Sequence, residues 1–181
     1  RVYMMHPAII IADEPVSMLD AAIRVLFLNV LLDFKQNYGM TTLFITHDLS
    51  TAYYVGGDVM VISKGRIVES GNVDDVLNRP AHPYTQLLLS SLPVPDPDAR
   101  WQEPASPRDV ESEASLIEPT RAQCLFSDRC PYVMPRCRDS VPEMYPVRDG
   151  QVARCFLYDE QSRAGQSVAP AAAGVDGQER T

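Results

Sequence analysis

The chain has 181 residues, 45% of them hydrophobic, which is enough for one sizeable core and an appendage. Its formal net charge of −8 at pH 7 argues against nucleic-acid binding, because proteins with that role carry basic surfaces. The sequence has no uncharged apolar run of about eighteen residues, the length that would predict a membrane-spanning helix.

The first predicted strand, residues 8–13, is a short apolar run that ends in two acids, Asp13 and Glu14. Such a run is typical of a buried parallel strand, and open α/β sheets bind ligands at the carboxyl ends of these strands. Asp13 suits a magnesium ion held through water, and Glu14 suits a base or orienting group for an attacking water. An isolated pair of acids, however, more often only caps a strand and begins a turn.

A helix is predicted to follow, capped by Asp20 and closed by Gly39 in the left-handed conformation. Residues 41–46 predict a second buried strand, with His47 at its carboxyl end. Strand, helix and strand in this order predict a parallel crossover, which would place His47 close to Glu14. The apolar residues of the helix recur at helical spacing and predict one buried face, made of Ile23, Leu26, Phe27, Val30, Leu31 and Phe34.

Three shorter elements are predicted next. They are a helix over residues 49–55, a hairpin of residues 59–63 and 66–69 around Lys64-Gly65, and a helix over residues 73–78. The first 79 residues therefore predict an α/β fold, in which parallel strands joined by crossover helices are followed by a small hairpin.

These features resemble the second half of an ATP-binding-cassette ATPase domain over residues 1–79. Residues 9–14 resemble the Walker B strand of that family, residues 17–20 resemble its D-loop, and His47 resembles its switch histidine. The resemblance implies the C-terminal part of a P-loop ATPase that uses ATP and Mg²⁺.

The resemblance also implies roles for individual residues. Glu14 would act on the attacking water, Asp13 on Mg²⁺ through water, and His47 on the γ-phosphate. The D-loop residues would lie at the interface between two such ATPase domains; they are Ser17, Leu19 and Asp20.

A G-x-x-x-x-G-K-[ST] phosphate loop is absent from the sequence, and the first predicted strand begins shortly after Arg1. In P-loop ATPases the backbone amides and the Lys of that loop hold the triphosphate. We therefore expect the chain to be the C-terminal piece of a longer protein, and this fragment alone to be inactive as an ATPase.

Residues 80–92 contain the segment His82-Pro83-Tyr84-Thr85, in which Pro83 suits the first turn of a helix. Taken alone, the segment predicts only a packing helix. Together with its neighbours it is similar to the HPY-type C-terminal extension of the oligopeptide, dipeptide and nickel importers.

Residues 93–119 hold six prolines among many acids and predict an extended linker. Residues 159–181 are rich in small and polar residues and predict a disordered tail. Between them, residues 120–158 predict a small irregular domain that carries all four cysteines: Cys124, Cys130, Cys137 and Cys155.

A segment as short as this cysteine-rich region needs a cross-link to fold stably. The residues alone leave three possibilities open, namely free or disulfide-bonded cysteines, a zinc site and a Cys₄ iron–sulfur cluster. The resemblance implies a [4Fe–4S] cluster on the four cysteines.

Together these features predict the ATP-binding and ATP-hydrolysing subunit of an importer for peptides or similar small solutes, peripheral on the cytoplasmic face of the cell membrane. The implied partners are transmembrane permease subunits, a second identical or different ATPase subunit and, indirectly, an external solute-binding protein. Two alternatives stay open: a soluble cassette ATPase not tied to transport, and a non-catalytic Cys-rich metal or redox module.

Overall fold

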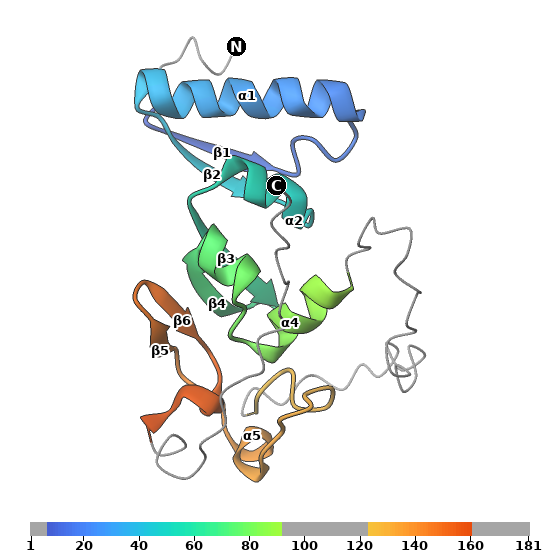
Figure 1. The fold of residues 1–181 in the computed structure, drawn as a ribbon, viewed down its shortest axis with the longest axis vertical. Helices are drawn as coiled ribbons and strands as arrows, with labels where there is room; N and C mark the ends of the chain where they lie inside the picture. The colour runs from blue at the N-terminus through green and yellow to red at the C-terminus, as the bar shows by residue number, and fades with distance from the viewer. Residues whose placement is uncertain (1–6, 92–122, 161–181) are drawn as a thin grey trace, which may run out of the picture. The chain divides into compact units, whose positions relative to one another are not determined.

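The computed structural model describes residues 7–91 and 123–160 and divides into two compact units, Arg1–Val59 and Met60–Thr181. Both units contain strands and helices (Figure 1), and strand and helix alternate in the first, in agreement with the predicted α/β class. The predicted linker at 93–119 and nearly all of the predicted tail at 159–181 lie outside the described residues, so both stay predictions.

The first unit is a parallel crossover followed by one short helix. β1 (Ile9–Asp13) and β2 (Thr41–Ile45) pair in parallel, and α1 (Ala21–Tyr38) connects them (Figure 1). Asp13 lies opposite Ile45, and α2 (Leu49–Val55) follows β2. The predicted crossover is confirmed, and it brings the carboxyl ends of the two strands to the same edge.

Both ends of α1 follow the capping rules. The Asp20 side chain accepts hydrogen bonds from the Ala22 and Ile23 amides at 3.1 and 3.0 Å. Gly39 has a φ of +64°, where a side chain would be strained, and its N–H donates to the Phe34 carbonyl. The predicted helix ends are therefore confirmed.

The buried side of α1 differs from the predicted face. Leu31 of the predicted face is buried, but so is Leu28, which was not predicted, and Ile23, Leu26 and Val30 are exposed. Apolar residues occur on more than one side of this helix, so their spacing alone could not select the side that packs inward.

The pair of strands β1 and β2 is open on one face. Side chains alternate between the two faces of a strand, and Ala12, on the inner face, is buried. On the other face, four large apolar side chains are exposed: Ile9, Ile11, Leu43 and Ile45. We predicted strands buried on both sides, but no element in the described part of this unit covers the second face.

The second unit is built on a four-stranded sheet with the order β3-β4-β6-β5. β3 (Asp58–Ser63) and β4 (Arg66–Asn72) form the predicted hairpin. Lys64 and Gly65 at its turn have positive φ values of 46° and 76°. Two successive positive values are the signature of a type I′ turn, whose twist suits a hairpin.

Two helices follow this hairpin, α3 (Val73–Asn78) and α4 (Pro83–Ser90). Pro83 occupies the first turn of α4, where its missing N–H costs no helical hydrogen bond. His82 caps α4, because its Nδ1 accepts a hydrogen bond from the Tyr84 amide at 3.0 Å. The helix predicted for this segment is thus confirmed.

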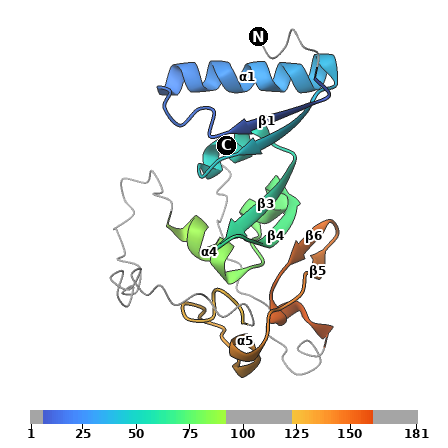
Figure 2. The ribbon, with the colours of Figure 1, turned by 180° about the vertical axis from the view of Figure 1, so that it is seen from behind.

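The cysteine-bearing segment contributes to the same sheet rather than forming a sheet of its own. β6 (Gln151–Ala153) pairs antiparallel with β4 and with β5 (Tyr145–Arg148), and Figure 2 shows β5 and β6 beside each other. The cysteine-bearing segment also contains the helix α5 (Pro135–Asp139) and the 3₁₀ turn η3 (Phe156–Tyr158). A separate Cys-rich domain is therefore not confirmed. Pairing between strands so distant in sequence leaves no periodic pattern from which it could be predicted.

A buried carboxylate connects β4, β6 and the start of α4. Glu69 is 0% exposed and accepts hydrogen bonds from the Ala81 amide at 2.8 Å, the His82 amide at 2.9 Å and Gln151 Nε2 at 2.7 Å. The Tyr158 hydroxyl donates to the Ala81 carbonyl at 2.9 Å. Three donors satisfy the carboxylate, as a charge without access to water requires.

Candidate functional site

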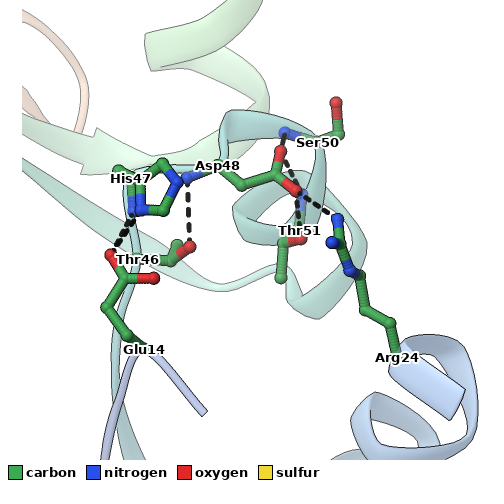
Figure 3. Close-up of polar contacts among 7 residues, drawn as sticks. All are labelled: Glu14, Arg24, Thr46, His47, Asp48, Ser50 and Thr51. Carbon is green, nitrogen blue, oxygen red and sulfur yellow. Dashed lines mark hydrogen bonds and ion pairs between the residues drawn. The ribbon is translucent and has the colours of Figure 1, made fainter. Parts of the chain in front are cut away.

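Glu14 and His47 lie side by side at the carboxyl ends of β1 and β2 (Figure 3), which is the closeness predicted from the parallel crossover. The backbone N–H of His47 donates to Glu14 Oε1 at 3.1 Å, and its ring Nδ1 lies 2.6 Å from the same oxygen. The His47 side chain is 79% exposed and that of Glu14 is 36% exposed. A carboxylate and an imidazole in contact and open to solvent can exchange a proton with a bound water.

The backbone of Glu14 is strained. Its φ of +46° lies in the left-handed region, which costs an L-residue about 1–2 kcal/mol. Two contacts hold it there: the Glu14 amide donates to the Ile45 carbonyl at 2.9 Å, and the Ser17 hydroxyl donates to the Glu14 carbonyl at 3.0 Å. Strain of this kind concentrates at functional sites, which fits a role for this residue beyond capping a strand.

The other residues predicted for the site flank Glu14 in the chain. Asp13 is exposed at the end of β1. Ser17 and Leu19 lie in the turn that follows, and Asp20 caps α1. The structure thus brings the predicted residues to one edge of the strand pair, although only Glu14 and His47 contact each other through their side chains.

Two residues for which no role was predicted, Arg24 and Asp48, hold the loop that carries His47 (Figure 3). One oxygen of the Asp48 carboxylate accepts the Ser50 amide at 2.9 Å and so caps α2. The other accepts the Thr51 hydroxyl at 2.7 Å and Arg24 Nη1 at 3.1 Å. An Asp directly before a predicted helix is an N-cap signal that could have indicated Asp48, whereas nothing local marked Arg24.

The electrostatics of Asp48 keep it charged. Partial burial raises the pKa of its carboxyl, but the hydrogen bonds from Thr51 and Ser50 and the charge of Arg24 outweigh burial and hold the pKa below its usual value. The carboxylate therefore stays ionised at neutral pH and can hold Arg24 as an ion pair.

The residues present fit part of a magnesium–nucleotide site. Mg²⁺ prefers oxygen ligands and keeps several waters, and the exposed Asp13 carboxylate can serve it through water. Within residues 7–91 and 123–160, no group of three or more His, Cys, Asp or Glu side chains is arranged to hold a metal ion. Mg²⁺ commonly takes its other ligands from substrate phosphates and water.

The four cysteines gather around one small pocket in the second unit. Cys137 and Cys155 are buried, Cys124 and Cys130 are half-buried, and all four are free thiols. Burial raises the pKa of the Cys155 thiol to about 12, and burial also raises the pKa of Cys124 and of Cys130. These three thiols are therefore protonated at neutral pH in the absence of a bound metal.

Across the part of the chain that the structure describes, no helix combines the length and the apolar character needed to cross a bilayer.

One match to a family model falls within the second unit. The family model described as the C-terminal region of oligopeptide/dipeptide transporters matches residues 68–137, from β4 through α4 to α5. This stretch includes the segment that begins with His82-Pro83-Tyr84.

Similar curated proteins cover most of the chain. A putative peptide import ATP-binding protein of Brucella ovis is 41% identical over 156 residues, which are 86% of this chain and 48% of that protein. The dipeptide transport ATP-binding proteins DppF of Escherichia coli and Haemophilus influenzae are 37% and 35% identical; each match spans 88% of this chain and 46% and 47% of those proteins. The chain spans about half the length of these curated relatives, and the matches confirm the resemblance recognised from the motifs.

Proposed function

We propose that this relative of peptide-import ATP-binding proteins is the C-terminal part of the ATP-binding and ATP-hydrolysing subunit of a peptide importer. The observation that carries the proposal is the contact of Glu14 with His47 at the carboxyl ends of two parallel strands. The names of the relatives support peptides as the solute class, and the match of the transporter C-terminal region supports this type of importer.

The proposed roles follow from exposure and contact. Glu14, partly open to solvent and held in a left-handed turn, orients the attacking water and accepts its proton. His47 projects beside it and would donate a hydrogen bond to the terminal phosphate, and Asp13 would hold a magnesium ion through water. When bound, the nucleotide would supply the leaving group and its magnesium ion would neutralise the developing charge.

The other half of the nucleotide site is proposed to lie outside these residues. The chain has no phosphate loop, and it spans about half the length of its relatives. The open apolar face of β1 and β2 is the surface that we expect the remainder of the ATPase domain to cover. Purified residues 1–181 should therefore show no ATP turnover.

We propose that the turn containing Ser17, Leu19 and Asp20 faces a second ATPase subunit, identical or different. Met18 in this turn is 97% exposed, and the D-loop that residues 17–20 resemble lies at the interface between two ATPase domains. The further partners proposed are transmembrane permease subunits and, through them, an external solute-binding protein. The subunit would then lie on the cytoplasmic face of the membrane.

The four cysteines are proposed to hold a [4Fe–4S] cluster. Cys124, Cys130, Cys137 and Cys155 line one pocket, yet in the described residues they are not arranged around a single metal ion. The gathering of four thiols at one pocket supports the cluster, and their spacing in the sequence lacks the C-x₂₋₄-C pairs common at zinc sites. The same pocket is the observation that favours the alternative of a metal or redox module.

Anaerobic purification followed by iron and sulfide analysis tests the cluster. We expect about four irons per chain and a broad visible absorption band, both lost in Cys130→Ser. Tyr132→Phe, a change in the same pocket at a side chain that cannot be a thiolate ligand, is the matched control and should keep the iron. Four titratable thiols without bound metal would contradict the cluster, and stoichiometric zinc would replace it with a zinc site.

The ATPase role is tested by Glu14→Gln in the longer protein that carries the phosphate loop. We expect turnover to fall by about 10²–10⁴-fold while ATP still binds, because the amide keeps the shape but cannot accept the proton. Glu143→Gln, an exposed glutamate in the second unit, is the matched control. Unchanged turnover in Glu14→Gln would contradict the assignment.

A further inference from the structure

His47 is held in place through the residues on either side of it. The Glu14 amide donates to the Ile45 carbonyl at 2.9 Å, and the His47 amide donates to Glu14 Oε1 at 3.1 Å. On the far side, the Asp48 amide donates to the Thr46 hydroxyl at 3.0 Å. The path of the chain through His47, and hence the direction of its ring, depends on where Asp48 lies.

Asp48 is held in turn by α1 (Figure 3). Arg24 Nη1 donates to Asp48 Oδ2 at 3.1 Å, and both side chains are half-buried. The Thr51 hydroxyl donates to the same oxygen, and the other oxygen caps α2, so both carboxylate oxygens are engaged. A charged pair with this many satisfied contacts is better fixed than an isolated surface pair.

Arg24 also connects this contact to the turn formed by residues 17–20. Its amide donates to the Asp20 carbonyl at 2.9 Å, so it belongs to the first turn of α1. At the other end of the turn, the Ser17 hydroxyl donates to the Glu14 carbonyl. The contacts and the chain itself therefore close a ring. Contacts join Glu14 to His47, Asp48 to Arg24, Arg24 to Asp20 and Ser17 to Glu14, and the backbone joins His47 to Asp48 and Ser17 to Asp20.

From this ring we infer that Arg24 and Asp48 are a positioning pair that couples the turn at residues 17–20 to the direction of His47. The inference rests on the proposed function, in which this turn faces a second ATPase subunit. Neither side chain of the pair touches reacting atoms. When the partner subunit displaces the turn, the start of α1 moves, and Arg24 carries Asp48 and the His47 loop with it.

The test uses Arg24→Gln and Asp48→Asn in the longer protein that carries the phosphate loop. Asn still caps α2 through its amide oxygen, so Asp48→Asn removes the charge and keeps the helix start. We expect kcat to fall about tenfold with the KM for ATP changed less than about twofold, as loss of alignment in the transition state predicts. The double variant should lose no more than either single one, because both act through one contact, and Arg24→Lys should restore part of the rate.

A spectroscopic measurement distinguishes a specific effect on the position of His47 from a general loss of folded structure. In ¹⁵N-labelled protein, the amide resonance of His47 is assigned by its loss in His47→Gln. We expect Arg24→Gln and Asp48→Asn to shift this resonance in the direction that Glu14→Gln shifts it, because each change weakens the hydrogen bond from His47 to Glu14. Asp75→Asn breaks the ion pair of Asp75 with Arg79 at the end of α3 and is the matched control; it should leave kcat and the resonance unchanged.

The outcomes distinguish this inference from the function on which it rests. If Glu14→Gln abolishes turnover while Arg24→Gln changes neither kcat nor the His47 resonance, the coupling is refuted and the proposed function stands. If Glu14→Gln leaves turnover intact, the proposed function fails. In that case, a His47 resonance that still shifts in Arg24→Gln supports the positioning pair independently of that function. An equal effect of Asp75→Asn also refutes a specific coupling.

Discussion

Each unit of the molecule contains a glutamate whose carboxylate accepts the backbone N–H of a histidine, yet the two pairs differ in exposure. In the first unit, Glu14 is 36% exposed and its partner His47 is 79% exposed. In the second unit, Glu69 is 0% exposed and its partner His82 is 2% exposed. The ring of His47 contacts its glutamate, whereas the ring of His82 turns away to cap α4 through the Tyr84 amide.

Because of this difference, the Glu14 carboxylate is accessible for chemistry, whereas the Glu69 carboxylate can serve only a structural role. Glu69 accepts hydrogen bonds from three protein donors and is fully buried, so its oxygens are inaccessible to water and to a substrate. Glu14 keeps part of its surface open and sits beside an open imidazole. The same two residue types thus serve structure in one unit and, by our proposal, chemistry in the other, and burial decides between them.

The largest expected effect that tests this contrast is on stability. Glu69→Ala should lower the free energy of unfolding by about 3 kcal/mol or more, because two backbone amides and the Gln151 amide lose their acceptor without access to water. Glu14→Ala should lower it by less than about 1 kcal/mol, because its donor can bond to solvent. Urea unfolding of residues 1–181, followed by circular dichroism, measures both; equal losses would remove the distinction.

A smaller effect is expected from pH. Burial lowers the pKa of His82 from 6.5 to about 4, although a hydrogen bond to the Arg154 backbone raises it slightly. Between these two pH values the unfolded chain binds more protons than the folded one, so this contribution to stability is complete above pH 6.5 and is lost as the pH falls toward 4.

From pH 7 to pH 4.5 the loss attributable to His82 should be about 2 kcal/mol. His82→Asn keeps a capping side chain without the titrating ring, and its stability should fall by that much less over the same interval. Urea unfolding at the two pH values provides the measurement. An identical pH dependence in the variant and the parent chain would show that the buried imidazole is not the group responsible.

The smallest effect concerns the strained backbone of the exposed pair. Glu14→Gly should stabilise the chain by up to about 1 kcal/mol, because glycine adopts a positive φ without strain. In the longer protein, the same change should abolish turnover. A thermal melt and an ATPase assay on one preparation test both halves, and a clear loss of stability would contradict the strain at this residue.

Several elements could be predicted because local chemistry decides them. Asp20 and Gly39 set the two ends of α1, Lys64 and Gly65 set the hairpin turn, and Pro83 set the start of α4. In the same way, parallel pairing of two apolar runs was sufficient to predict that Glu14 and His47 meet. Their roles in hydrolysis stay predictions, as do the roles of the D-loop residues and of the cysteines.

The remaining features depend on contacts that leave no local pattern. The left-handed backbone of Glu14 is fixed by the Ile45 carbonyl on another strand, and the burial of Glu69 depends on an amide from β6. The ion pair of Arg24 with Asp48 joins residues 24 positions apart. The inward side of α1 could not be chosen because apolar residues occur on several of its sides.

The pairing of β4 with β6 has a consequence for the order of folding. Gln151 reaches Glu69 across 82 positions of sequence, and closing so large a loop is slow compared with forming a hairpin or a helix. We expect the hairpin of β3 and β4 and the helix α4 to form first, while the Glu69 carboxylate is still hydrated. The carboxylate then loses its water only when β6 pairs with β4. We therefore expect burial of Glu69 to be the last step in assembly of the second unit.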